Sequence, residues 1–314
     1  DTSSGVAGGT ADVTTNGGSS AFSNTTDTAS VTVNAVNDSP TFSGLDATPA
    51  YTEDGAAVQL DADATISDLE LGALNGGNGN YSGSNLTLIR NGGANASDIY
   101  SVLTSGNLTV AGGPNGGGTI SASGNVIATI ANTGDGQLQI TFVNNGTIPT
   151  TALINEVLQA IYYRSSSNDL SSSVQLDVTF NDGTSSNTVS STVSNTDIND
   201  APSITATGTN PIFIEDAGAS DLYNTVSTDT VETGQTFSAL TLTVTNVADD
   251  SSEILSFDGS DVALTNGNSV TTATNGLTVN VSLTGSTATT SFSGATLTEA
   301  QLQTLVDALT YRNS

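Results

Sequence analysis

The chain of 314 residues has no cysteine, histidine, lysine, methionine or tryptophan. It therefore lacks imidazole bases, thiolate nucleophiles, Schiff-base amines and His/Cys metal sites, which excludes much of enzyme chemistry. Its three cations, Arg90, Arg164 and Arg312, cannot neutralise a row of phosphates, so we expect no nucleic-acid partner. No apolar run approaches the ~18–20 residues of a membrane span. These absences predict a protein that is neither an enzyme nor a transmembrane protein.

Acidic residues supply nearly all of the charge. There are 31 Asp and Glu against 3 Lys and Arg, a formal net charge of -28. Repulsion of this size keeps a chain soluble but opposes compaction. Because disulfides are absent too, a cation held by carboxylates is the remaining source of stability, and the composition predicts a secreted, calcium-binding protein. The sequence starts in mid-pattern at Asp1, and we expect it to be a piece of something longer.

Apolar and polar residues alternate with a period of two along most of the chain. This alternation, together with turn pairs such as Asn91-Gly92 and Asp182-Gly183, is typical of short strands in a β-sandwich. The alternating runs are residues 27–34, 86–89, 137–142, 174–180, 240–245 and 277–283. The predicted fold class is all-β.

Two segments have helical spacing instead, residues 151–161 and 298–309. Thr298 is a candidate N-cap of the second segment. Each segment runs into a Tyr-Arg pair, Tyr163-Arg164 and Tyr311-Arg312, so the segments form an internal repeat. We therefore expect one short helix in each sandwich.

A linker motif sets the period of the repeat. Val36-Asn-Asp-Ser-Pro40 recurs as Ile198-Asn-Asp-Ala-Pro202, which places Asp38 and Asp200 162 residues apart. The predicted domains are a C-terminal hairpin and linker (1–38, with a strand at Ala29–Val33), a complete sandwich (39–200), and a sandwich without its last strands (201–314).

Two explanations fit this circular permutation. In the first explanation, a long tandem protein has been divided at an arbitrary point within one repeat. In the other explanation, residues 1–38 of one subunit complete residues 201–314 of its neighbour by donor-strand exchange. Both predict identical or similar repeat units joined head to tail, as a tandem chain or a homopolymer.

Three acidic clusters recur in each unit, and calcium takes six to eight oxygen ligands of this kind. The candidate ligands of the first unit are Asp38, Glu53, Asp54, Asp68 and Glu70. Those of the second are Asp197, Asn199, Asp200, Glu215, Asp216, Asp229 and Glu232. We expect the acidic clusters of the linker, of the early strand and of the end of the next strand to meet at one pole of the sandwich, beside the preceding unit. The alternative is that these acids are ordinary solvated turn residues.

Several motifs resemble one known family. They are Thr52-Glu-Asp-Gly55 with Ile66-Ser-Asp-Leu-Glu70, Leu305–Asn313 and Val31–Pro40. The chain resembles, over essentially its whole length, the cadherin-like repeats of giant bacterial surface or secreted proteins of the RTX-adhesin type. The resemblance implies a linear array of Ig/cadherin-like sandwiches with calcium at the junctions, held by Asp38, Glu53, Asp54, Asp68, Glu70, Asp200, Glu215 and Asp216. Asp229-Thr-Val-Glu232 departs from the Asp-Leu-Glu spacing of the first unit.

These observations predict a structural role at the bacterial cell surface or in the extracellular matrix of a biofilm. The leading hypothesis is a repeat unit of a calcium-stabilised fibre, filament or adhesin stalk. The alternative is an adhesive module that binds a glycan or another surface, with cell-surface glycans as a further partner.

Overall fold

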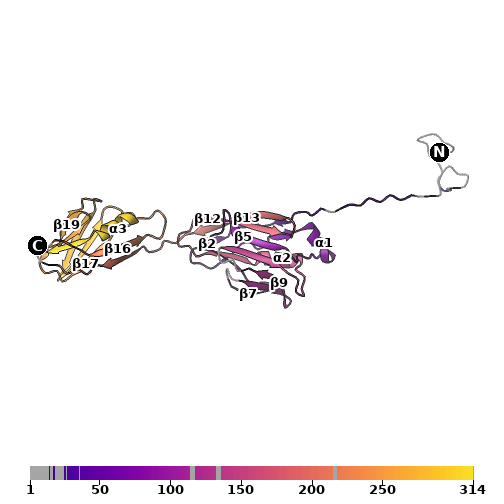
Figure 1. The fold of residues 1–314 in the computed structure, drawn as a ribbon, viewed down its shortest axis with the longest axis horizontal. Coiled ribbons are helices and arrows are strands. Elements are labelled where there is room, and N and C mark those ends of the chain that lie inside the picture. Colours follow the sequence, from indigo (N-terminus) through magenta and orange to yellow (C-terminus); the bar gives the residue numbers. More distant parts are fainter. Residues whose placement is uncertain are drawn as a thin grey trace, which may run out of the picture. The chain divides into compact units, whose positions relative to one another are not determined.

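The computed structural model describes residues 14, 17, 25, 27–34, 36–113, 117–131, 136–214 and 218–313. The chain divides into two units, residues 1–38 and 39–314. Short strands dominate the second unit, together with three helices of nine residues each in the described part (Figure 1). The all-β fold class is confirmed.

The first sandwich contains an eight-stranded sheet of order β2-β13-β12-β5-β10-β9-β8-β7. Its strands are β2 (Ala50–Thr52), β5 (Asn85–Arg90), β7 (Leu108–Gly112), β8 (Gly118–Ala122), β9 (Asn125–Ile130), β10 (Gln137–Phe142), β12 (Ser173–Asn181) and β13 (Ser186–Thr196). The smaller sheets, β3-β11-β6 and β1-β4, use β1 (Thr41–Ser43), β3 (Val58–Gln59), β4 (Thr65–Ser67), β6 (Asp98–Val102) and β11 (Ile161–Ser165). Pairs of described strands are antiparallel, except that β2 lies parallel to β13.

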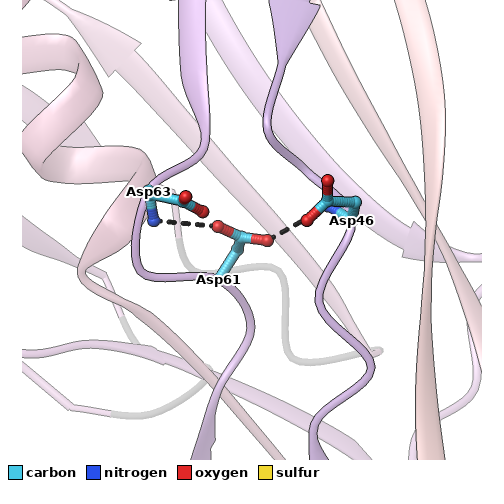
Figure 2. Close-up of side chains that lie close together, drawn as sticks. All are labelled: Asp46, Asp61 and Asp63. Carbon is cyan, nitrogen blue, oxygen red and sulfur yellow. Dashed lines mark hydrogen bonds between the residues drawn. The ribbon is translucent and has the colours of Figure 1, made fainter.

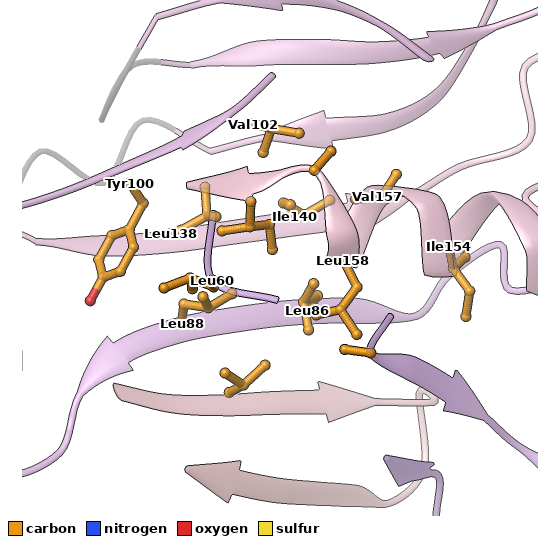
Figure 3. Packing of buried hydrophobic residues seen from close by; sticks show 14 of the residues in the cluster. Leu60, Leu86, Leu88, Tyr100, Val102, Leu138, Ile140, Ile154, Val157 and Leu158 are labelled. Atoms are coloured by element: carbon orange, nitrogen blue, oxygen red, sulfur yellow. The ribbon is translucent and has the colours of Figure 1, made fainter. Parts of the chain in front are cut away.

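Alternation along each strand builds the core of the first sandwich. In β12, Leu176, Val178 and Phe180 are fully buried, while the residues between them face outward or are half-buried. Figure 3 shows Leu86 and Leu88 of β5 among the side chains of this core, together with Leu158 of helix α2. The period of two thus turns one face of the large sheet into a continuous apolar surface.

Helices α2 (Thr151–Gln159) and α3 (Glu299–Asp307) form where helical spacing predicted them. Each buries three apolar residues, Ile154, Val157 and Leu158 in α2 and Leu302, Leu305 and Val306 in α3. Thr298 is confirmed as an N-cap, and it forms a capping box with Gln301. Both helices pass directly into the strand that carries the Tyr-Arg pair.

Helix α1 (Leu69–Gly77) shows that the prediction of one helix per sandwich is wrong for the first sandwich. Asp68 caps it, with the side chain accepting from the Leu71 N–H. It buries no residue and is interrupted at Leu74, Asn75 and Gly76, which have non-helical backbone angles. Such a glycine-rich, irregular turn has no helical periodicity for the sequence to reveal.

The second sandwich has three sheets, β14-β16, β15-β23-β18-β19 and β17-β22-β21-β20. Their strands are β14 (Ser203–Gly208), β15 (Ser220–Asp221), β16 (Tyr223–Asp229), β17 (Thr241–Thr245), β18 (Glu253–Phe257), β19 (Ser260–Ala263), β20 (Ser269–Thr271), β21 (Thr278–Thr284), β22 (Thr287–Ser293) and β23 (Thr310–Asn313). A 3-10 turn, η2 (Asp250–Ser252), precedes β18. This sandwich has its own apolar core, with members from Val226 to Leu309, whereas the first core runs from Tyr51 to Val193.

The predicted strand at Ala29–Val33 is wrong for the free chain. Residues 27–34 have no regular secondary structure, and Val31 and Val33 are 87% and 86% exposed. Alternation alone does not make a strand, because a strand also needs a partner for its backbone hydrogen bonds. Most of residues 1–24 of the predicted hairpin and linker (1–38) lie outside the described residues, and the domain boundaries stay predictions.

Candidate functional site

The parallel pairing of β2 with β13 decides where Glu53 lies. Thr52 pairs with Thr196, so Glu53 arrives beside the outgoing linker rather than beside Asp68. The Glu53 N–H donates to the Thr196 carbonyl (2.9 Å), and the Ile198 N–H donates to Glu53 Oε2 (2.8 Å). The expectation that Glu53 joins the ligands next to the preceding unit is therefore wrong. It belongs to the junction with the following sandwich.

The second sandwich meets the same linker through Glu232 and Gln235. The Asp200 N–H donates to Glu232 Oε1 (2.5 Å), and Gln235 Nε2 donates to Asn199 Oδ1 (2.7 Å). The linker backbone is thus held by one glutamate from each sandwich, Glu53 on one side and Glu232 on the other. Five predicted ligands, Glu53, Asp197, Asn199, Asp200 and Glu232, gather at this junction, which we call the linker site.

Asp169 is a member of this region that the sequence interpretation missed. Its Oδ2 accepts from Thr233 of the second sandwich, from Oγ1 at 2.5 Å and from the N–H at 3.3 Å. The next residue, Leu170, donates its N–H to Asp197 Oδ1 (2.7 Å). The signal was present, because Asp169 follows Tyr163-Arg164 in a polar stretch that begins the last two strands.

Three carboxylate oxygens of the linker site are buried without a hydrogen-bond partner. They are Glu53 Oε1, Asp200 Oδ2 and Glu232 Oε2. Glu53 and Glu232 are only 3% and 6% exposed. A buried carboxylate oxygen without a donor or a cation costs several kcal/mol, so native proteins rarely leave one unpaired. Carboxylate oxygens are the ligands that Ca²⁺ prefers. These three oxygens are not among the carboxylate groups of the described residues whose oxygens lie within 4.8 Å of one another.

The pKa of Glu53 also reflects the burial of several carboxylates at the linker site. The Ile198 N–H favours the charged carboxylate, yet burial and the negative charges of Asp197 and Asp200 together raise the pKa above its ordinary value. The two ion pairs among the described residues lie elsewhere. Arg90 forms an ion pair with Asp98 (2.6 Å) and Arg312 forms one with Asp261 (2.7 Å).

Asp68 and Glu70 lie near the other end of β13. Asp68 Oδ1 accepts from the Leu71 N–H (2.7 Å), while its Oδ2 is buried without a partner. Burial, followed by the charges of Asp182 and Glu70, raises the pKa of Asp68. Asp182 precedes the first residue of β13, and Asp197 follows the last, so the eleven-residue strand separates these two acidic regions by about 36 Å.

The remaining predicted ligands are placed differently. Asp54 follows Glu53 but is exposed, in a turn with φ 54°. Asp229 is exposed and accepts from the Val231 N–H (2.8 Å). Glu215 and Asp216 lie outside the described residues.

Asp38 belongs to the first unit, where it is exposed. Its backbone carbonyl accepts from Asn37 Nδ2 (2.9 Å). The same contact joins Asn199 Nδ2 to the Asp200 carbonyl (3.0 Å). The two linkers therefore share a local conformation as well as a sequence motif.

Asp46, Asp61 and Asp63 form a separate acidic cluster, with one oxygen of each within 4.8 Å of the others (Figure 2). Asp61 already accepts four backbone hydrogen bonds, from Asp46 and Ala47 (3.2 and 3.1 Å) and from Asp63 and Ala64 (2.9 and 2.8 Å). Burial opposes its ionisation, but these donors outweigh burial and lower the pKa of Asp61. Both Asp61 oxygens thus hold the loop together.

Comparisons with known proteins add little to this geometry. No protein-family model matches the chain, and no curated protein matches it. A solved structure of the extracellular cadherin domains 1–4 of protocadherin gamma B7 is similar at 12% identity and a TM-score of 0.24. The match covers 84% of this chain and 42% of that one. Because this TM-score is too low to support a fold assignment, the assignment rests on the strands and sheets of the structure itself.

No described helix is long and apolar enough to cross a membrane.

Proposed function

We propose that this chain is a structural repeat unit of a calcium-stabilised extracellular bacterial fibre, filament or adhesin stalk, in which units follow one another head to tail. The carrying observation is the set of three buried, unpartnered carboxylate oxygens of Glu53, Asp200 and Glu232 at the linker between two sandwiches. The strongly acidic composition supports the same proposal, because it supplies oxygen ligands and almost no competing cations.

In this proposal the linker site holds Ca²⁺ through Glu53, Asp197, Asp200 and Glu232, with Asn199 beside them. The positive charge of the ion offsets the repulsion between these carboxylates and the free-energy cost of their desolvation. Glu53 reaches the linker from the first sandwich and Glu232 from the second, so both already fix the backbone that the ion would bridge. Without the ion, the same carboxylates repel one another and the junction loosens.

The proposed role is mechanical rather than catalytic. None of the described aromatic side chains is exposed, and the exposed large hydrophobic residues are all aliphatic. Glycan recognition usually relies on exposed aromatic rings. This observation favours a structural repeat over the alternative of a glycan-binding module in the described part of the chain.

Small-angle X-ray scattering of the full chain at low protein concentration, with calcium and after chelation, tests the proposal. Calcium stiffens the junction, so we expect a narrower spread of interdomain distances with the ion than without it. Glu232→Gln should remove most of this response, because it deletes a charge at the linker. Asp54→Asn is the matched control, an exposed acid that should leave the response intact. A calcium response absent from the unmodified chain, or equally lost in both variants, would overturn the proposal.

A further inference from the structure

The two sandwiches share one pattern of strands, so their loops can be compared residue by residue. The Phe142 N–H donates to the carbonyl two residues before Leu86, and the Phe292 N–H donates to the carbonyl two residues before Leu242. β17 therefore stands in the place of β5, with Leu242 for Leu86. The same comparison applies to the segments that follow β4 and β16.

The loop after β16 corresponds to the turn after β4. Asp229 pairs with Ser203 of β14, and 162 residues earlier Ser67 pairs with the residue at the same place in β1. The same offset places Thr230 at the position of Asp68. The second sandwich therefore has a threonine where the first has the acid that caps its own turn.

Glu299, the first residue of helix α3, brings a carboxylate to this position instead. Its Oε1 accepts from the Thr230 N–H (2.7 Å) and from the Thr230 hydroxyl (2.9 Å). Its backbone carbonyl accepts from the Thr228 hydroxyl (2.9 Å). Helix α2 of the first sandwich begins with Thr151, which has a shorter and uncharged side chain. The loop of the second sandwich is therefore held by a helix rather than by a cap of its own.

The backbone of residues 229–235, which we call the junction loop, takes a conformation that has to be held in place. Val231 has a φ of 71°, in the left-handed region that β-branched residues rarely adopt. Such a conformation is unfavourable by itself and persists only where its surroundings determine it. Asp229 Oδ1 accepts from the Val231 N–H (2.8 Å), while Glu299 holds the residue before Val231.

The junction loop also makes the contacts of the second sandwich with the linker and with the first sandwich that were described above. Glu232, Thr233 and Gln235 each form one of them. The Thr230 hydroxyl lies 3.3 Å from the Glu232 carbonyl. Helix α3 is thus connected to the linker site by a short path, from Glu299 through Thr230 to Glu232.

We propose that Glu299 is a positioning residue of the linker site, which fixes the junction loop so that the Glu232 carboxylate is in place before an ion binds. This role rests on the proposed function and adds a residue that acts on the ion only through Thr230 and Glu232. Without the Glu299 carboxylate, the Thr230 N–H loses its acceptor and the left-handed conformation of Val231 loses a support. Glu232 then has more conformational freedom to lose when calcium binds, which lowers the affinity.

Two substitutions separate the hydrogen bond of Glu299 from its charge. Glu299→Ala removes the acceptor, and we expect calcium affinity to fall by about tenfold, as is typical when a residue that orients a metal ligand is lost. Glu299→Gln removes the charge but keeps an oxygen that can accept from Thr230, so it should retain most of the affinity. Asp307→Ala is the matched control, because it removes an exposed acid from the other end of α3. Isothermal titration calorimetry of the full chain gives the dissociation constants.

Amide hydrogen exchange in the presence of a chelator reports on the junction loop without calcium. Glu299→Ala should speed exchange of the Thr230 and Thr233 amides by about tenfold, because a loop that has lost a contact opens more often. The amides of β21, in the core of the same sandwich, should keep their protection. This readout distinguishes a loosened loop from a weakened fold.

The inference is wrong if Glu299→Ala binds calcium as tightly as the unmodified chain, or if Glu299→Gln loses as much affinity as Glu299→Ala. It is also wrong if exchange in β21 accelerates as much as exchange in the junction loop, since Glu299 would then stabilise the whole sandwich. An unmodified chain that binds no calcium would instead overturn the proposed function, whatever the exchange of the loop.

Discussion

The two sandwiches share one pattern of strands but differ in how well the pattern is buried. β5 of the first sandwich has a neighbour on each side, and its Leu86 and Leu88 are fully buried. β17 of the second has one neighbour in the described part of the chain, and its Leu242 and Val244 remain half-buried. The comparison shows that alternation determines which residues can face a core, while the adjoining strands determine how much area they bury.

Truncation of the equivalent leucines should give the largest difference between the sandwiches. Leu86→Ala should destabilise the first sandwich by about 3 kcal/mol, because it leaves a cavity in a closed core. Leu242→Ala should cost the second sandwich only about 1 kcal/mol, since part of that side chain already meets solvent. Chemical denaturation of dilute protein measures both values. Equal losses would contradict the view that the second core is open at this edge.

The next largest effect should be the loss of calcium affinity when a carboxylate at the junction between the sandwiches is removed. Glu53→Gln removes a carboxylate that is buried beside Asp197 and Asp200, and we expect affinity to fall by about 10–100-fold. Isothermal titration calorimetry gives the dissociation constant. Asp54→Asn changes an exposed neighbour and should leave it nearly unchanged. The assignment of Glu53 to the site is wrong if both variants bind equally well.

Removal of the helix caps should give a smaller difference in stability between the two sandwiches. Thr298 forms a capping box with Gln301, whereas Thr150 makes a single long contact of 3.4 Å with the Leu153 N–H. Thr298→Ala should therefore cost the second sandwich about 1 kcal/mol, and Thr150→Ala should cost the first only a few tenths. Urea denaturation provides the measurement. A larger loss in Thr150→Ala would show that cap geometry is not the deciding factor.

Acidification should have the smallest effect, and its sign should depend on calcium. Glu53 and Asp68 have raised pKa values in the folded chain, so the folded state takes up protons before the unfolded state does. Without calcium, lowering the pH from 7 towards about 5 should therefore raise the melting temperature. With calcium the same change should lower it, because protons compete with the ion. The pKa of Asp61 is lowered in the folded chain, so protonation of Asp61 reduces the stability of the fold only when the pH falls below the ordinary pKa of this carboxyl. A melting temperature that falls on acidification in chelator would contradict this account.

Much of the fold could be predicted from local patterns. The i, i+4 spacing of Leu153 and Val157 was sufficient for α2, although the predicted helix extended to Ile161, which begins β11. Period-two runs were sufficient for β5, β10, β12, β17 and β21. Helix α1 could not be predicted, because Asp68 caps an irregular turn rather than a periodic helix. The strand at Ala29–Val33 was wrong because alternation shows which side chains share a face but not whether a partner strand is paired with them.

The sequence named the residues of the linker site as candidate ligands, but it did not predict which of them lie together. The Asn-Asp-x-Pro linker and the Glu-Asp pair were recognised as ligand-like in the sequence. The parallel pairing that carries Glu53 to Ile198, 145 residues later, leaves no local signal. Asp169 was missed although it lies in a polar stretch after the Tyr-Arg pair, because its contact with Thr233 joins two sandwiches.

Thermal unfolding of the full chain with calcium and then with a chelator tests the central claim most directly. The account predicts that calcium raises the melting temperature, and that Glu53→Gln and Glu232→Gln each reduce the rise while Asp54→Asn preserves it. An ion that binds only the folded state must stabilise it by mass action. A melting temperature unchanged by calcium would show that the buried oxygens of Glu53, Asp200 and Glu232 do not form a calcium site.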